Sequence, residues 1–177
     1  LAQAPVPELA RLRREAVRTG AIAVPDGTYT PLDGVRGDQL DIETTLRLEP
    51  GAAARLVVRE SADGPERTVI EVSRAADGAT GTLRLHREAS SLDPAVDCEP
   101  RYGELPLNGD GVVDLRVLVD HSALEIFANG RALAARIYPT RTDALGVGIA
   151  AVGAVAVERL DAWRMASVFD GPRPLWP

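Results

Sequence analysis

The sequence contains no lysine: all 20 of its basic residues are arginine, against 26 acidic residues, so the formal net charge of the 177 residues is −6. Proteins that bind a nucleic-acid backbone present a basic surface, and a chain with this charge disfavours nucleic-acid binding. No apolar run approaches the roughly 20 residues that a helix needs to cross a bilayer. We therefore expect neither a nucleic-acid partner nor a membrane span.

Cysteine, histidine and aromatic residues are also scarce. Cys98 is the one cysteine, which excludes an internal disulfide, and with only His86 and His121 beside it the chain cannot assemble a closed zinc site of sulfur and nitrogen ligands. We expect no metal and no cofactor. Aromatic residues make up 4% of the sequence. Because Met165 is the only methionine and the sequence begins at Leu1, we expect a fragment or a processed product.

Alternation of apolar and polar residues is abundant from Asp38 onward. In residues 40–48 the even positions are mostly apolar and the odd positions charged or polar, which is typical of a strand with one buried face. Similar short segments follow, separated by turn residues such as Asp77-Gly78 and Asn129-Gly130. The predicted strands are 40–48, 54–60, 68–73, 82–87, 112–120, 123–128, 131–138, 146–152 and 155–165.

No long amphipathic helix interrupts these segments, which disfavours parallel crossover units. We therefore predict an all-β fold, a two-sheet antiparallel β-sandwich of the jelly-roll or lectin-like kind. Near the start, Leu9, Leu12 and Ala16 have helical spacing and Gly20 could end a helix, so this segment is either a short helix or a linker. The expected organisation is an interdomain linker and lead-in over 1–36, the sandwich over 37–169 and a Pro-rich C-terminal tail over 170–177.

The clearest local pattern lies in residues 117–139, which read as three strands joined by two tight turns. Asn129-Gly130 supplies two residues that tolerate the positive φ of a type I′ hairpin turn. That turn pairs Ile126 with Leu133 and places Glu125 diagonal to Arg136, where we expect an exposed ion pair. The predicted core face consists of Leu124, Ile126, Leu133, Ala135 and Ile137, and the opposite face of Glu125, Phe127, Ala134, Arg136 and Tyr138.

The same stretch carries a family resemblance. Its motif is Asp-x-Ser-x-x-Glu-x-Phe, then an Asn-Gly turn, a strand and Tyr-Pro, represented here by Asp120, Ser122, Glu125, Phe127, Asn129, Gly130, Tyr138 and Pro139. This motif resembles the C-terminal β-sandwich module of glycoside hydrolase family 32, the invertase, levanase and inulinase family of β-fructofuranosidases. Residues 3–13 are similar to the link that follows the catalytic propeller in that family, and residues 37–42 to the first strand of the sandwich.

The resemblance implies a two-domain enzyme whose upstream five-bladed propeller hydrolyses β-fructosidic bonds with retention. Such hydrolysis needs two carboxyl groups about 5–5.5 Å apart. In the family they lie in Asn-Asp-Pro-Asn-Gly and Glu-Cys segments, with a third acidic residue in Arg-Asp-Pro, and none of these segments occurs in the 177 residues. We assign no catalytic residue here. The expected function is a non-catalytic module that stabilises and bounds the propeller of an enzyme acting on sucrose, levan or inulin, and the family resemblance suggests an extracellular location.

Two local patterns invite a catalytic interpretation. Asp97-Cys98-Glu99 has the residue types of the family's Glu-Cys motif in reverse order, but it lies between prolines in a predicted loop, where solvated carboxylates stay ionised. Asp120, His121 and Ser122 are the three residue types of a catalytic triad, yet adjacent residues of one tight turn cannot adopt its geometry. We expect Asp120 and Ser122 to cap backbone amides of the turn instead.

Two further functions stay open. One is a fructan-binding or other carbohydrate-binding module. Such modules hold sugars against aromatic rings, in which this chain is poor, and Trp163 fits core or interdomain packing better. The aromatic residues are Tyr29, Tyr102, Phe127, Tyr138, Trp163, Phe169 and Trp176. The other is a self-sufficient hydrolase, which rests only on the number of acidic residues.

Overall fold

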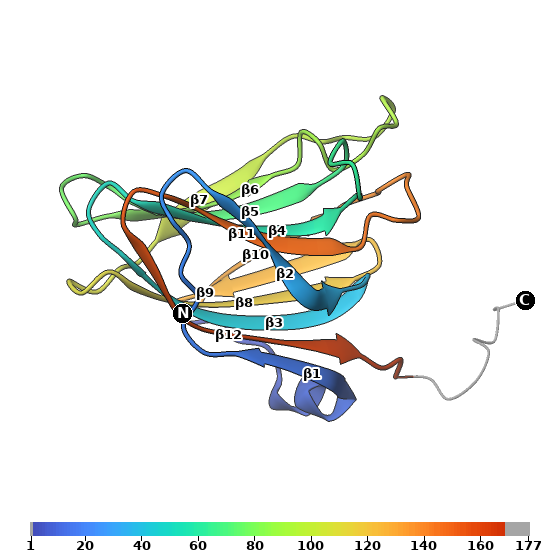
Figure 1. Ribbon diagram of the computed structural model, residues 1–177, viewed down its shortest axis with the longest axis horizontal. Coiled ribbons are helices and arrows are strands. Elements are labelled where there is room, and N and C mark those ends of the chain that lie inside the picture. Colours follow the sequence, from blue (N-terminus) through green and yellow to red (C-terminus); the bar gives the residue numbers. More distant parts are fainter. Residues whose placement is uncertain (1, 169–177) are drawn as a thin grey trace, which may run out of the picture.

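The computed structural model describes residues 2–168, which form two antiparallel six-stranded sheets packed face to face (Figure 1). The predicted two-sheet β-sandwich is therefore confirmed. Sheet A has the order β1 (Arg13–Thr19), β12 (Val155–Met165), β3 (Gln39–Leu48), β8 (Val112–Asp120), β9 (Ala123–Ala128) and β10 (Arg131–Arg136). Sheet B has the order β2 (Tyr29–Arg36), β11 (Gly146–Val152), β4 (Ala53–Glu60), β5 (Thr68–Arg74), β6 (Gly81–His86) and β7 (Arg101–Leu105).

Alternate residues of the inner strands fill the space between the sheets. In β3 the even positions face this core, and Ile42 has no exposed surface. Ile70 of β5 and Leu85 of β6 contribute from sheet B and are equally buried. Complete burial of such a side chain stabilises the fold by about 1.5–3 kcal/mol. The odd positions of β3 therefore lie on the outer face of sheet A.

All nine strands predicted from the alternation are present, with bounds that differ by at most two residues. The hairpin register is also confirmed, because Ile126 pairs with Leu133 and Phe127 with Ala132. Three strands were not predicted: β1, β2 and β7. Each of them lies at the edge of a sheet, where one side of the strand has no neighbour in the order.

The N-terminal helix is shorter than its spacing pattern suggested. A 3-10 helix, η1, covers Pro7–Leu12, and the chain becomes extended at Arg13 to form β1, so Gly20 ends no helix. Pairing of β1 with β12 outweighs the weak helical preference of a single short turn. β2 likewise pairs with β11, so residues 13–36 supply one strand to each sheet. Phe169, Trp176 and the Pro-rich tail 170–177 lie outside the described residues.

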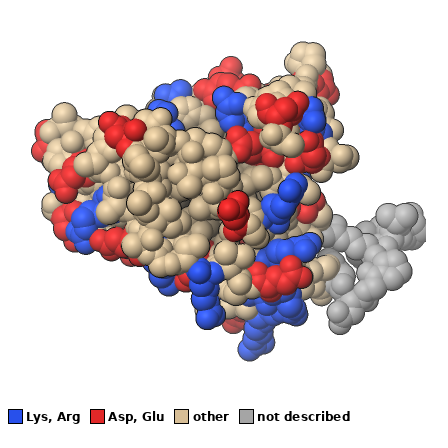
Figure 2. Space-filling model, in the orientation of Figure 1, with Lys and Arg blue, Asp and Glu red and all other residues tan. Residues whose placement is uncertain are grey.

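The segment before β1 runs over the outer face of sheet A. The Gln3 amide donates to the Gly130 carbonyl oxygen at 2.9 Å, and η1 lies on the side of sheet A that faces away from sheet B (Figure 1). Basic side chains gather in the lower part of Figure 2, with acidic side chains among them. η1 and β1 contain Arg11, Arg13, Arg14 and Arg18. The two outer faces of the sandwich therefore differ: residues 2–12 partly cover that of sheet A.

Candidate functional site

The hairpin of the family motif is held by the side chain of Asn129. Asn129 and Gly130 have φ values of 45° and 78°, as the predicted type I′ turn requires. The Asn129 Oδ1 accepts from the Asp114 amide at 2.9 Å, and its Nδ2 donates to the carbonyl oxygens of Pro106 and Val112, both at 3.0 Å. One side chain thereby ties the β9–β10 turn to β8 and to the segment before it.

The exposed polar residues of the motif make contacts that differ from the expectation. Arg136 donates from Nη1 to Ser122 Oγ at 3.0 Å and forms no ion pair with Glu125, so that prediction was wrong. Asp120 accepts from the Gln39 side-chain amide at 3.3 Å. Asp120 and Ser122 therefore bond to side chains rather than to the turn amides. The reason is the register, which places Arg136 directly opposite Ala123, next to Ser122.

The turn between β8 and β9 contains no nucleophile-base pair. His121 has a positive φ of 54°, and its Nδ1 lies 3.0 Å from Asp38 Oδ2. Ser122 Oγ is occupied by Arg136. Because a triad needs its hydroxyl hydrogen-bonded to the imidazole, this turn cannot perform nucleophilic catalysis.

A buried charge cluster lies on the outer face of sheet A. Asp41 of β3 has no exposed surface, and both of its oxygens are paired with arginines: Arg116 of β8 donates at 2.9 and 2.8 Å, and Arg13 of β1 at 2.7 Å. Arg13 also contacts the neighbouring Glu43 and stacks on the Trp163 ring, 3.7 Å from its centroid. Trp163 therefore belongs to this outer cluster and not to the core. The cluster thereby links edge strand β1 to the central strands β3 and β8.

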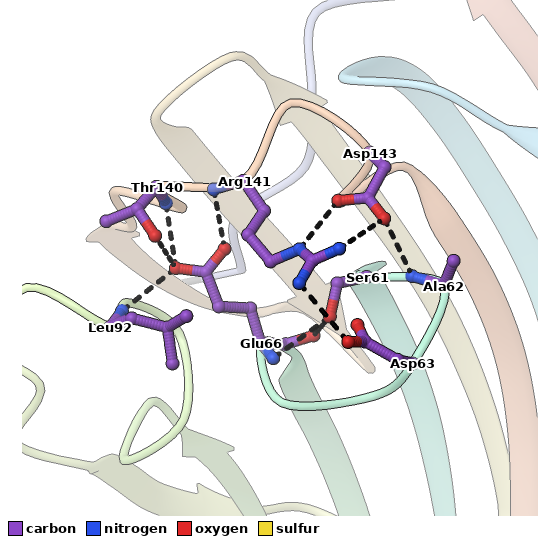
Figure 3. Close-up of polar contacts among 8 residues, drawn as sticks. All are labelled: Ser61, Ala62, Asp63, Glu66, Leu92, Thr140, Arg141 and Asp143. Carbon is purple, nitrogen blue, oxygen red and sulfur yellow. Dashed lines mark hydrogen bonds and ion pairs between the residues drawn. The ribbon is translucent and has the colours of Figure 1, made fainter.

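A second buried carboxylate, Glu66, joins three loops at one end of the sandwich (Figure 3). Its Oε1 accepts from the Leu92 amide at 2.9 Å and from the amide and hydroxyl of Thr140, both at 2.7 Å. Its Oε2 accepts from the Arg141 amide at 2.8 Å. Burial would raise the pKa of the Glu66 carboxyl, but these hydrogen bonds outweigh it and hold the pKa below its usual value.

Arg141 extends this loop cluster outward. Its guanidinium binds both oxygens of Asp143, at 2.9 and 3.0 Å, and Asp63 at 3.2 Å (Figure 3). The Arg141 side chain lowers the pKa of Asp143 to about 2. The sequence reasoning missed Glu66 and Arg141, although Thr140 directly follows the Tyr-Pro that ends the family motif. Tyr138 itself is half exposed.

The Asp97-Cys98-Glu99 segment is a loop, as predicted. Asp97 Oδ1 accepts from the Glu99 amide at 2.8 Å, and Arg87 and Arg101 lie within 3.4 Å of Oδ2. These contacts, the hydrogen bond first, lower the pKa of Asp97. A general acid needs a raised pKa so that it stays protonated. Asp97 has the opposite electrostatic setting, which argues against an acid/base role.

Over residues 2–168, no three His, Cys, Asp or Glu side chains gather in a way that could hold a metal ion. In the same range, no helix is long and apolar enough to cross a bilayer.

Comparison with known families places the chain. A model described as "Glycosyl hydrolases family 32 C terminal" matches residues 8–164. The chain is 31% identical to the insoluble isoenzyme 6 of β-fructofuranosidase from Oryza sativa subsp. japonica and 31% identical to sucrose:sucrose 1-fructosyltransferase from Festuca arundinacea. Each alignment covers 94% of this chain but 35% and 31% of the relative, so the chain spans about a third of their length.

Solved structures share the fold. Fructan 1-exohydrolase IIa from Cichorium intybus superposes with a TM-score of 0.82 at 20% identity, over 93% of this chain and 38% of that one. Exo-inulinase from Aspergillus awamori gives a TM-score of 0.73 at 21% identity, over 95% of this chain and 33% of that one. The family model covers nearly all described strands, and the chain therefore belongs to glycoside hydrolase family 32, as its C-terminal domain.

Proposed function

We propose that this chain is the non-catalytic C-terminal sandwich of an enzyme acting on β-fructosides such as sucrose, levan or inulin, and that it stabilises and bounds a catalytic propeller. The family match over residues 8–164 is the observation that carries the proposal. The names of the relatives, which include β-fructofuranosidases and a levanase, support the substrate class. Glu66, Asp97 and Asp143 all have lowered pKa values, which argues against each of these three carboxyls as the general acid.

The outer face of sheet A is the side on which a propeller would adjoin. The segment 2–12 crosses this face, and the Arg13–Asp41 pair fixes its end. A hollow of about 230 Å³ opens beside η1, with Leu9, Leu118 and Met165 among its lining residues. A preceding domain attached to this segment would therefore lie against sheet A and could insert apolar side chains beside η1.

A chimeric enzyme tests the supporting role. The chain would replace the sandwich of chicory fructan 1-exohydrolase IIa, to which it corresponds over 38% of the length. We expect the chimera to keep its activity to a higher temperature than the propeller alone. An equal inactivation temperature would contradict the supporting role. The separate 177-residue chain should release no fructose from sucrose, levan or inulin, and turnover by it would contradict the non-catalytic assignment.

A second function, contact with carbohydrate, is favoured by one specific observation. The outer face of sheet B carries exposed tyrosines at both edges and a hollow between them. We propose that fructan is a partner of the sandwich as well as a substrate of the parent enzyme.

A further inference from the structure

A single cross-strand row runs over the full width of sheet B. The registers place six residues side by side on its outer face, one from each strand: Tyr29, Ala150, Arg55, Glu71, Arg84 and Tyr102. Neighbouring strands are about 4.8 Å apart, so the five steps between the two tyrosines span about 24 Å. This length suits several units of an extended chain rather than one small molecule.

The middle of this row lies beside a hollow. Its volume is about 420 Å³, and Val57, Val69, Ala89 and Ala150 supply its apolar lining. Its polar lining comes from Arg55, Arg67, His86 and Glu88. An apolar lining with a few polar groups around it is the usual composition of a small-molecule or saccharide site.

Two side-chain nitrogens, one lining the hollow and one in the row beside it, have no hydrogen-bond partner. Arg84 Nε and His86 Nε2 are both sheltered from solvent and make no hydrogen bond to the described residues. His86 Nε2 lies 3.6 Å from Glu71 Oε2, beyond hydrogen-bond distance. Groups of this kind cost free energy unless a ligand or water satisfies them.

The tyrosines at the two ends offer ring surfaces. Tyr102 of edge strand β7 is 76% exposed. Tyr29 of edge strand β2 is 41% exposed, and its ring lies over Gly148, where any Cβ would come within 2.4 Å of the ring carbons. The glycine therefore makes room for a ring that covers β11 and reaches Glu60 of β4 with its hydroxyl.

We propose that the outer face of sheet B is a binding site for a neutral oligosaccharide chain, with Tyr29 and Tyr102 at its ends and Arg84 and His86 over its middle. The charges argue for a neutral ligand. Arg55 pairs with Glu71 at 2.6 Å and Arg84 with Glu88 at 3.7 Å, so these cations are already balanced by carboxylates. Together with Glu88, the charged residues of the row have no net charge, so they offer no excess of positive charge to a polyanion. Sugar hydroxyls both donate and accept, which matches alternating guanidinium and carboxylate groups.

Ring contacts supply the remaining complementarity. The apolar face of a sugar packs on an aromatic ring, and the two rings at the edges would hold a chain across the strands. The strand-to-strand alternation of Arg55, Glu71 and Arg84 then fits a polymer of repeated hydroxyl-bearing units. This inference gives the carbohydrate contact proposed above its location, and it does not depend on the supporting role of the sandwich.

Affinity electrophoresis of the 177-residue chain tests the proposal. Native gels would contain inulin, levan, dextran or alginate. We expect retardation by at least one of the three neutral polymers, and the polymer that retards the chain identifies the sugar and linkage. Retardation by alginate alone, or by none of the four, would overturn the proposal.

Variants locate the binding. Tyr102→Ala and Arg84→Ala should each weaken binding by about fivefold or more. Tyr138→Ala is the matched control, because Tyr138 is also an exposed tyrosine, 49% accessible, but lies beyond β10, outside sheet B. Unchanged binding by both sheet B variants, or an equal loss with Tyr138→Ala, would contradict the site. Circular dichroism and the thermal midpoint of each variant would show that the fold is retained.

The two proposals fail separately. A chain that binds no polysaccharide but stabilises the chimeric enzyme would remove the sheet B site and leave the supporting role intact. A chain that binds inulin or levan but gives the chimera no added stability would remove the supporting role and leave the sheet B site intact.

Discussion

Arg116 clamps both carboxylate oxygens of Asp41, through Nε at 2.9 Å and Nη2 at 2.8 Å, although Asp41 lies on the outer face of a sheet. Arg13 adds a third contact to the same carboxylate. The guanidinium of Arg13 also stacks on the Trp163 ring. Asp41 is thereby as inaccessible as a core residue. Through this carboxylate, β1, which pairs with β12 and has no strand on its other side, is also linked to β3 and β8.

Replacement of this carboxylate should destabilise the domain. We expect Asp41→Asn to lower the free energy of unfolding by about 3 kcal/mol, because it leaves the two largely covered guanidinium groups with Glu43 as their one remaining carboxylate. Urea denaturation followed by circular dichroism measures the change. Glu158→Gln is the control: Glu158 pairs with Arg47 on the same sheet, but both side chains are about 40% exposed, so its loss should stay below about 1 kcal/mol. Equal effects of the two changes would mean that the Asp41 cluster has no special role.

Glu66 should make the free energy of unfolding depend on pH in the acidic range. Its pKa is lowered in the folded state, so its contribution is fully present above the ordinary carboxyl pKa of about 4.3 and is lost as the pH falls through the lower folded value. We expect Glu66→Gln to cost about 3 kcal/mol at pH 7, because an amide places its own donors against backbone amides. The difference in unfolding free energy between Glu66→Gln and the native chain should narrow below about pH 4. A pH-independent gap would contradict this account, and the exposed Glu49→Gln serves as the control.

Asn129 should matter more than its place in a surface turn suggests. Asn129→Ala removes three side-chain hydrogen bonds and places alanine at a positive φ. We expect a loss of about 2–3 kcal/mol in unfolding free energy, measured by urea titration. Asn108→Ala, at an exposed turn residue, should change it by less than about 0.5 kcal/mol. Near-equal effects would show that the hydrogen bonds of Asn129 contribute little.

The two faces of β9 should respond differently to truncation. Ile126 is completely buried, and Ile126→Ala should cost about 2–5 kcal/mol because it leaves a cavity between the sheets. Glu125 is exposed and forms no ion pair with Arg136, so Glu125→Ala should change the thermal midpoint little. Differential scanning calorimetry compares the two. A small effect of the isoleucine change would mean that the core relaxes around it.

The inner strands could be predicted from sequence because burial of one face imposes alternation. The three missed strands lie at edges and follow other rules. β2 contains Pro31 and Gly34, which read as a loop signal but are tolerated where a strand has a free side. Four of the five residues of β7 are exposed, so that strand carries no alternation. β10 is also an edge strand, but the Asn129-Gly130 turn revealed it.

The contacts of the candidate site were less predictable because they join distant loops. Glu66 finds its partners 26 residues away at Leu92 and 74 residues away at Thr140, and these donors are mostly backbone amides, which any residue could provide. No local pattern marks such a contact. In contrast, the strand order and registers of sheet B are enough to show which residues share its outer face. They align the row from Tyr29 to Tyr102.

The strand order also constrains how the domain is made. β11 lies between β2 and β4, and β12 between β1 and β3, although both are synthesised last. A nascent chain emerging from the ribosome therefore cannot close sheet B until β11 has left the exit tunnel, or sheet A until β12 has left it. Until then β2 and β1, respectively, have no neighbouring strand to pair with. Closure of the two sheets is therefore governed by long-range pairing, which is slow. Premature termination within the last two strands would release a polypeptide with open sheet edges, a substrate for chaperones or proteases rather than a shortened domain.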